Sequence, residues 1–133
     1  RNPIVAHEYL GNSVEGKDVF IADDIISSGE SMLDIAEELK KRHAGNIYCY
    51  STYPIFTNGL DSFDKAYAEG MISGVFGTNL TYQSPELLSR EWYHEVDMSK
   101  YIAFYIAALN HNISVTQLLD PHKKIQQLLD AHR

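Results

Sequence analysis

The stretch VFIADDIISSGES, residues 19–31, decides the fold. It opens with a short apolar run of β-branched and aromatic residues, which is typical of a strand buried on both faces of a sheet. Two aspartates and a loop of serines and glycine follow at once. We therefore expect a strand over residues 18–22, then the loop, and then a helix over residues 31–42. The apolar residues that fall on one face of this helix are Met32, Ile35, Ala36 and Leu39.

The same order of strand and helix repeats along the chain. Patterns of apolar and β-branched residues predict further strands over 46–53, 74–78 and 93–96, and helices over 60–69 and 85–91. Strands that alternate with helices favour a parallel sheet with helices packed against it. The sequence therefore predicts an α/β fold, in which a parallel sheet is flanked by helices.

The last third of the chain has a different character. Residues 100–110 form a predicted helix that is apolar on nearly every face, so it must be buried in the domain or against a partner. Asp120 and Pro121 begin a last helix with a single apolar stripe. At the other end, residues 4–10 predict a strand or the end of a hairpin. The chain opens at Arg1 without a methionine, and we expect a single domain over residues 1–133 that is a piece of a longer enzyme.

The composition is that of a globular protein. The chain has 133 residues, of which 44% are hydrophobic and 22% charged, enough for one core. A net charge of −7 argues against a nucleic-acid partner, because binding to the phosphate backbone needs clustered Lys and Arg. No apolar run reaches the ~18 residues of a membrane span, and no signal-peptide pattern is present. We expect a cytoplasmic protein without a membrane partner, in which the single cysteine, Cys49, is reduced and buried.

The loop after the first strand has the chemistry of a sugar phosphate site. Backbone amides over residues 28–31 precede a helix whose dipole is positive at its start, and this combination binds phosphate without a basic side chain. The hydroxyls of Ser27 and Ser31 add two donors. The carboxylates of Asp23 and Asp24 accept hydrogen bonds from neutral hydroxyl groups. A molecule with a phosphate at one end and hydroxyls nearby, such as ribose 5-phosphate, satisfies both halves.

At this point the chain resembles a known family. Residues 19–31 are similar to the phosphoribosyl-binding motif of type I phosphoribosyltransferases and of ribose-phosphate pyrophosphokinases, also called phosphoribosyl pyrophosphate synthetases. Residues 52–56, TYPIF, resemble a strand-end THG-hydrophobic-F segment of the synthetases, with Tyr53 and Pro54 in place of His and Gly. Residues 77–80, GTNL, resemble VTNT, and residues 112–119, NISVTQLL, resemble an SVSxLF ending. The chain is thus similar to the carboxyl-terminal domain of the synthetases over nearly its whole length, with a fold like that of type I phosphoribosyltransferases.

The resemblance implies an activity for the full-length protein. The family transfers the β,γ-pyrophosphoryl group of ATP to the 1-hydroxyl of ribose 5-phosphate, with Mg²⁺, and releases AMP. It implies that Asp23 holds ribose hydroxyls and helps to position Mg²⁺, that Asp24 orients the loop or reaches the sugar, and that residues 27–31 cradle the 5-phosphate. The expected substrate-binding residues are Asp23, Asp24, Ser27, Ser28, Gly29, Glu30 and Ser31.

The same resemblance places the catalytic Lys and Arg upstream of this stretch, and most ATP contacts in another domain. We therefore expect no catalytic residue in this chain, and binding of sugar phosphate without turnover. We expect the full-length enzyme to be a homo-oligomer.

Several alternatives are weighed against this interpretation. Glu30 stands where the family often has glycine, and we expect its side chain to point to solvent. A phosphoacceptor receiver domain also has an acidic pair after a strand, but its third strand ends in an aspartate, whereas this one ends Gly77-Thr78-Asn79. The serines and aspartates could also serve only to cap the helix. A non-catalytic regulatory or assembly paralogue of the synthetase, and another phosphoribosyltransferase, stay open.

Overall fold

The structure is a computed structural model that describes residues 11–116 and 121–131. The strand or hairpin expected over residues 4–10 lies outside the described residues. The chain divides into two compact units, one ending at Val96 and one beginning at Asp97, and each is considered by itself. The expectation of a single domain stays a prediction.

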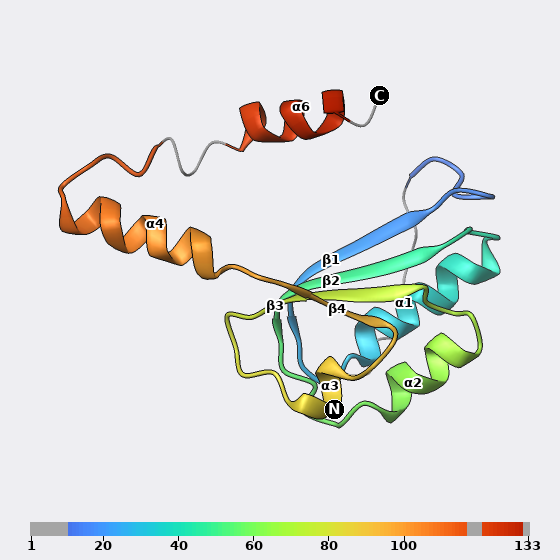
Figure 1. Cartoon of the computed structure of the whole chain (residues 1–133). Helices are drawn as coiled ribbons and strands as arrows, with labels where there is room; N and C mark the ends of the chain where they lie inside the picture. Colours follow the sequence, from blue (N-terminus) through green and yellow to red (C-terminus); the bar gives the residue numbers. More distant parts are fainter. Residues whose placement is uncertain (1–10, 117–120, 132–133) are drawn as a thin grey trace. The chain divides into compact units, whose positions relative to one another are not determined.

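The first unit is a parallel sheet with helices, as expected. Its four strands lie in the order β1-β2-β3-β4, and each adjacent pair is parallel. The strands are β1 (Val19–Ile26), β2 (Ile47–Pro54), β3 (Gly74–Thr78) and β4 (Tyr93–Val96), and the helices are α1 (Glu30–Lys41), α2 (Asp61–Ala68) and α3 (Pro85–Leu88). Figure 1 shows α1 and α2 on the same side of the sheet. The predicted α/β fold is confirmed.

The first strand is longer than the sequence predicts. We expected it to end at Ala22, but β1 continues to Ile26 and pairs with β2 as far as Pro54. The buried Ser51 hydroxyl accepts a hydrogen bond from the amide of Ile26 at 3.0 Å and donates to the carbonyl of Asp24 at 3.2 Å. The acidic pair therefore lies inside the strand and not in the loop after it. Aspartate has a low strand propensity, so the local sequence pattern predicts that the strand ends before the acidic pair. The hydrogen bonds of Ser51 come from the neighbouring strand, and a local pattern does not include them.

The core of this unit lies between the sheet and the two long helices. The helices contribute Met32, Ala36, Leu39, Phe63 and Ala66, and the strands contribute Ile47, Cys49 and Val75. Each of these strand residues is fully buried. From Ile47 to Ser51 every second side chain of β2 is buried, which places the core on one face of the sheet.

The thiol of Cys49 is free and buried, as expected. Burial raises the pKa of this thiol to about 12. Burial favours the neutral thiol in the folded state. The contribution of Cys49 to the free energy of unfolding is therefore fully present below the pKa of the unfolded thiol, and it falls as the pH rises from about 9 toward 12. We expect a thiol reagent at pH 8 to label Cys49 only when the protein unfolds. Fast labelling under native conditions would contradict the burial.

The other face of the sheet carries a row of rings. Phe20 and Phe76 lie 6.3 Å apart between ring centroids, Phe20 contacts Tyr50, and Phe76 contacts Tyr48 and His94. The apolar run at the start of residues 19–31 predicts a buried Phe20, and this is wrong, because its side chain is 58% exposed. Phe20 is exposed because α1 and α2 cover the opposite face of the sheet. The rings of Tyr48 and Phe76, on the same face as Phe20, are half-buried.

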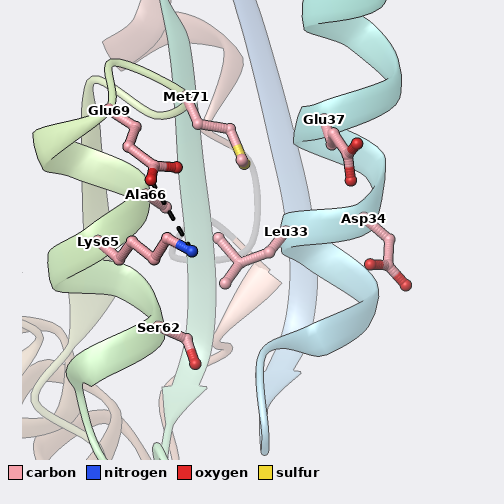
Figure 2. A pocket seen from close by; sticks show the side chains of 8 residues that line it. All are labelled: Leu33, Asp34, Glu37, Ser62, Lys65, Ala66, Glu69 and Met71. Carbon is pink, nitrogen blue, oxygen red and sulfur yellow. Dashed lines mark ion pairs between the residues drawn. The ribbon is translucent and has the colours of Figure 1, made fainter.

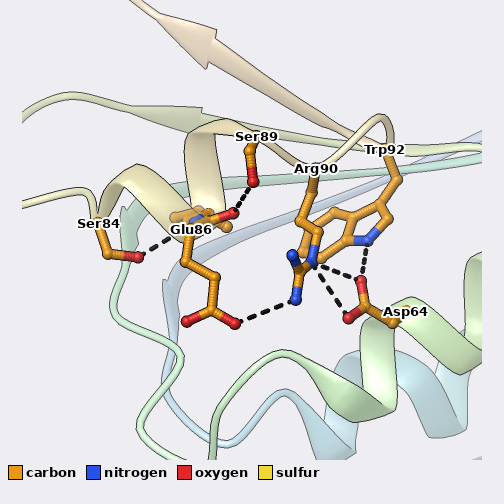
Figure 3. Close-up of polar contacts among 7 residues, drawn as sticks. Asp64, Ser84, Glu86, Ser89, Arg90 and Trp92 are labelled. Carbon is orange, nitrogen blue, oxygen red and sulfur yellow. Dashed lines mark hydrogen bonds and ion pairs between the residues drawn. The ribbon is translucent and has the colours of Figure 1, made fainter.

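A polar cluster joins α2 to α3 and β4. Asp64 accepts hydrogen bonds from Nε of Arg90 at 3.0 and 3.1 Å and from the indole nitrogen of Trp92 at 2.7 Å. The guanidinium of Arg90 also pairs with Glu86 at 3.1 Å. Figure 3 shows the side chains of Arg90 and Trp92 both pointing to the carboxylate of Asp64. Ser84 caps α3 by accepting a hydrogen bond from the amide of Leu87, which supports the short helix that begins at Pro85.

We expect Asp64→Ala to lower the free energy of unfolding by about 1–3 kcal/mol, because it leaves the buried indole N–H of Trp92 without an acceptor. Asp64→Asn keeps an oxygen in place, so its loss should be smaller. Trp92 is the only tryptophan, so its fluorescence during denaturant unfolding reports directly on this cluster. The exposed ion-pair partner Glu86 is the control, since Glu86→Ala should change stability by less than about 1 kcal/mol. Equal losses for Asp64→Ala and Glu86→Ala would contradict this account.

The second unit contains α4 (Ser99–Asn110) and α6 (His122–Ala131), close to the predicted ranges. Within the described residues, the apolar side chains of both helices are mostly exposed: Ile102, Phe104, Ile106, Leu109, Ile125, Leu128 and Leu129. Only Ala108 of α4 is buried. The expected burial of this helix therefore stays a prediction. No helix among the described residues is long and apolar enough to cross a membrane.

Candidate functional site

The loop between β1 and α1 is set by one glycine. Gly29 has φ +80° and ψ −5°, the left-handed conformation, and it occupies the N-cap position of α1. The helix begins at Glu30, one residue before the predicted start at Ser31. Left-handed backbone is accessible to glycine at little cost and to other residues only with strain. This glycine therefore permits the abrupt change from the strand to the helix.

Gly29 is also packed against an aromatic ring. A Cβ atom built on Gly29 would lie 2.5 Å from Cζ of Phe63 and closer still to Cε2. The Phe63 ring is fully buried and packs edge-to-face against Phe56, with ring centroids 5.0 Å apart. The loop is thus held directly against the aromatic core, so its backbone position is fixed by packing as well as by hydrogen bonds.

Four backbone donors at the start of α1 have no hydrogen-bond partner among the described residues. The amides of Ser28, Gly29, Ser31 and Met32 donate no hydrogen bond to any other described residue, and α1 has no side-chain cap. The amide of Glu30 has only a long contact, 3.4 Å, to the hydroxyl of Ser28. Such donors, at the positive end of a 12-residue helix, are the groups that bind anions. The side chain of Glu30 is exposed.

The two aspartates are both exposed, at the end of β1 that leads into this loop. One carboxylate oxygen of Asp23 accepts a hydrogen bond from the amide of Asp24 at 2.8 Å. The structure thus places all seven predicted residues on one strand, loop and helix start.

The described residues contain no group of three or more His, Cys, Asp or Glu side chains placed to hold a metal ion. Mg²⁺ is commonly held by one or two carboxylates together with substrate phosphates and water, and not by a cage made entirely of protein ligands. An exposed carboxylate such as that of Asp23 fits a site in which Mg²⁺ is shared with substrate phosphates and water. It does not by itself make a metal centre.

Sequence reasoning missed one residue at this site, Thr57. The hydroxyl oxygen of Thr57 lies 3.3 Å from that of Ser27, and the amide of Thr57 donates to the carbonyl of Ser27 at 2.9 Å. Thr57 follows β2 and comes 30 residues later in the chain. No local pattern marks it. Only the rule that the carboxyl ends of parallel strands lie along one edge could have suggested that it is near Ser27.

The segments that follow β2 and β3 lie along this same edge. The buried Thr78 hydroxyl donates to the carbonyl of Thr52 at 2.6 Å, which joins the ends of the two strands. Gln83 donates to the carbonyl of Thr78 at 2.7 Å and to the hydroxyl of Tyr93 at 2.9 Å. Burial, with a smaller contribution from the charge of Glu95, raises the pKa of the Tyr93 phenol to about 12. This phenol is therefore neutral at physiological pH.

In the described part of the chain, pockets lie beside the long helices and the loops. One, of about 130 Å³, lies between α1 and α2 and is shown in Figure 2. Its lining includes the acids Asp34, Glu37 and Glu69 but a single cation, Lys65, and none of the predicted site residues. A second, of about 260 Å³, is lined at the end of β2 and in the loop after it by Pro54, Ile55, Phe56, Gly59 and Leu60, and in and before α3 by Tyr82, Ser84, Glu86 and Leu87. The acidic lining of the first pocket makes it unsuited to a phosphate.

Comparisons with known proteins identify relatives of this chain. Residues 7–120 match the family described as the phosphoribosyl synthetase-associated domain. A ribose-phosphate pyrophosphokinase of Shewanella oneidensis is 28% identical over 110 residues, which is 83% of this chain and 34% of the relative. One of Thermococcus kodakarensis is 38% identical over 81 residues, 59% of this chain and 29% of the relative.

A solved structure gives the same fold. The phosphoribosylpyrophosphate synthetase of Mycobacterium smegmatis superposes with a TM-score of 0.66 at 20% identity, covering 77% of this chain and 33% of that protein. The chain thus spans about a third of the length of the relatives that it matches. Because the family match extends over most of the sequence, this chain belongs to the phosphoribosyl synthetase-associated domain family and is related to the ribose-phosphate pyrophosphokinases.

Proposed function

We propose that this chain is the ribose 5-phosphate-binding part of a ribose-phosphate pyrophosphokinase. The observation that carries the proposal is the set of unpaired amides at the start of α1, beside exposed hydroxyls and carboxylates, in a chain of this family. Helix-start amides bind a phosphate group, whereas carboxylates bind neutral hydroxyls. A sugar phosphate presents both kinds of group on one small molecule.

Each predicted residue has a role in this proposal. The amides and hydroxyls of Ser27, Ser28, Gly29 and Ser31 hold the 5-phosphate, and Glu30 contributes its backbone while its carboxylate stays in solvent. Asp23 accepts hydrogen bonds from ribose hydroxyls, and Asp24 orients the end of the strand or reaches the sugar. Asp23 is also the residue that would contact Mg²⁺. When Mg²⁺ is bound together with the phosphates of ATP, it neutralises part of their charge.

The proposed reaction of the full-length protein is transfer of pyrophosphate from ATP to ribose 5-phosphate, giving phosphoribosyl pyrophosphate and AMP. Phosphoryl-type transfer depends on positioning and on cations that offset the charge of the transferred group. The predicted site in this chain contains no Lys or Arg. We therefore propose that this chain binds the sugar phosphate but releases no AMP from ATP by itself, and that the whole enzyme acts as a cytoplasmic homo-oligomer.

Titration calorimetry with ribose 5-phosphate, inorganic phosphate and ribose tests the binding claim. We expect ribose 5-phosphate to bind more tightly than either of the other two, because only it engages both the amides and the carboxylates. Ser31→Ala should weaken ribose 5-phosphate and phosphate alike. Equal affinity for ribose 5-phosphate and ribose, or no heat with any of the three, would refute the proposal.

A non-catalytic paralogue is the second candidate. It is favoured by Tyr53 and Pro54, which stand where the synthetase segment has His and Gly. Pro54 is buried, and its ring packs so close to Gly77 that a Cβ there would lie 2.7 Å from Cγ. The end of β2 is thus built around this proline. Binding of ribose 5-phosphate without AMP release in the full-length protein would favour the paralogue over the enzyme.

A further inference from the structure

We infer that Thr57, in the loop after β2, is a further ligand for the phosphate. The anion is then held between the loop after β1 and the loop after β2. This inference rests on the proposed function, because it assigns a further residue to the same site. The phosphoribosyl-binding stretch at residues 19–31 does not include Thr57. In the folded chain, its contact with Ser27 places Thr57 beside this stretch.

The two loops are joined by a series of backbone hydrogen bonds. The amides of Ile55 and Phe56 donate to the carbonyl of Ile26 at 2.9 and 3.1 Å, and the amide of Thr57 donates to the carbonyl of Ser27 at 2.9 Å. Three successive residues after β2 are therefore fixed to the two residues that precede Ser28. This arrangement holds the Thr57 side chain beside that of Ser27, at the start of the loop that leads to α1.

The backbone at Phe56 is held in an unusual conformation. Phe56 has φ +51°, in the left-handed region that residues other than glycine adopt only with strain. Its ring is anchored by contacts with Phe63, Trp92 and Tyr93, at centroid distances of 5.0, 5.9 and 6.2 Å. The turn that this conformation produces directs the chain so that Thr57 faces Ser27. Strain that packing maintains beside the loop proposed to bind the phosphate favours a functional role for the residue it positions.

The hydroxyl groups of Ser27 and Thr57 are suited to a shared acceptor. They lie 3.3 Å apart, longer than the about 2.7–2.8 Å of a well-formed O–H···O hydrogen bond. Both residues are exposed, and each hydroxyl carries one proton that can rotate. A phosphate oxygen between them would receive a charge-assisted hydrogen bond from each, which is stronger than the contact that they make with each other.

The inference is tested by titrating this chain with ribose 5-phosphate and with inorganic phosphate, following the amide signals by ¹H–¹⁵N NMR. We expect Thr57→Val to weaken both affinities by about tenfold, the effect of one charge-assisted hydrogen bond. Thr57→Ser keeps the hydroxyl and should stay within about threefold of wild type. Asn58 is the next exposed residue of the same loop, and Asn58→Ala should leave both affinities unchanged. The dispersion of the spectra shows in each case that the fold is retained.

The outcomes separate this inference from the proposed function. If Thr57→Val binds both anions as tightly as wild type does, the inference is wrong while ribose 5-phosphate binding stands. If Thr57→Ser loses as much affinity as Thr57→Val, the hydroxyl is not a ligand and the inference is again wrong. If wild type binds neither anion, the inference and the proposed function fail together.

Discussion

Replacing Gly29 by alanine is expected to lower the free energy of unfolding by about 2–5 kcal/mol, which is large for a single methyl group. Two effects add. The left-handed φ of +80° strains any residue with a Cβ, and the new Cβ would overlap the ring of Phe63, which has no exposed surface through which to move away. Urea denaturation followed by circular dichroism measures the change.

Gly59 provides a matched control, because it has the same φ of +80° but nothing within 4 Å of an added Cβ. Gly59→Ala should therefore cost only the backbone strain, roughly 1–2 kcal/mol. The difference between the two variants isolates the clash with Phe63. Equal losses would show that Phe63 does not constrain the loop. Gly29→Ala should also reduce ribose 5-phosphate binding in the fraction that remains folded, because the amides after residue 28 would shift.

Asp23→Asn is expected to weaken ribose 5-phosphate binding by about tenfold to a hundredfold, since a carboxylate that accepts hydrogen bonds from sugar hydroxyls contributes about 1.5–3 kcal/mol. Inorganic phosphate has no such hydroxyls, so its affinity should stay the same or rise slightly as a negative charge is removed. Calorimetric titration of both ligands measures the two effects on one sample.

Asp24→Asn is the comparison for this prediction. It removes the same charge one residue away along β1. We expect it to weaken ribose 5-phosphate binding less than Asp23→Asn does. Both side chains are exposed, so neither variant should unfold the protein. If Asp24→Asn is as damaging as Asp23→Asn, the two carboxylates act together and the assignment of the sugar hydroxyls to Asp23 alone is wrong.

The sequence predicted the architecture well because its signals are local. The apolar stripe on α1 and the β-branched runs of β2 and β3 each lie within one element, and the resulting order of strand and helix specifies a parallel sheet. The sharp turn at Gly29 was likewise predictable from the serine and glycine residues around it.

The predictions failed where distant residues decide the outcome. β1 runs on through two aspartates because Ser51, on another strand, satisfies its backbone groups. Phe20 was expected in the core, but which face of the sheet the helices cover depends on the whole topology. Thr57 could not be found from its neighbours, since its contact with Ser27 spans 30 positions. Each of these is a tertiary contact, which residue patterns do not encode.

The most direct test of the central claim is the ¹H–¹⁵N spectrum of this chain during titration with ribose 5-phosphate. The claim is that the unpaired amides at the start of α1 bind the phosphate. It predicts that the largest shifts occur at the amides of Ser28, Gly29, Ser31 and Met32, and that they saturate together. Shifts that leave these four amides unmoved while others respond, or no saturable shift anywhere, would contradict it.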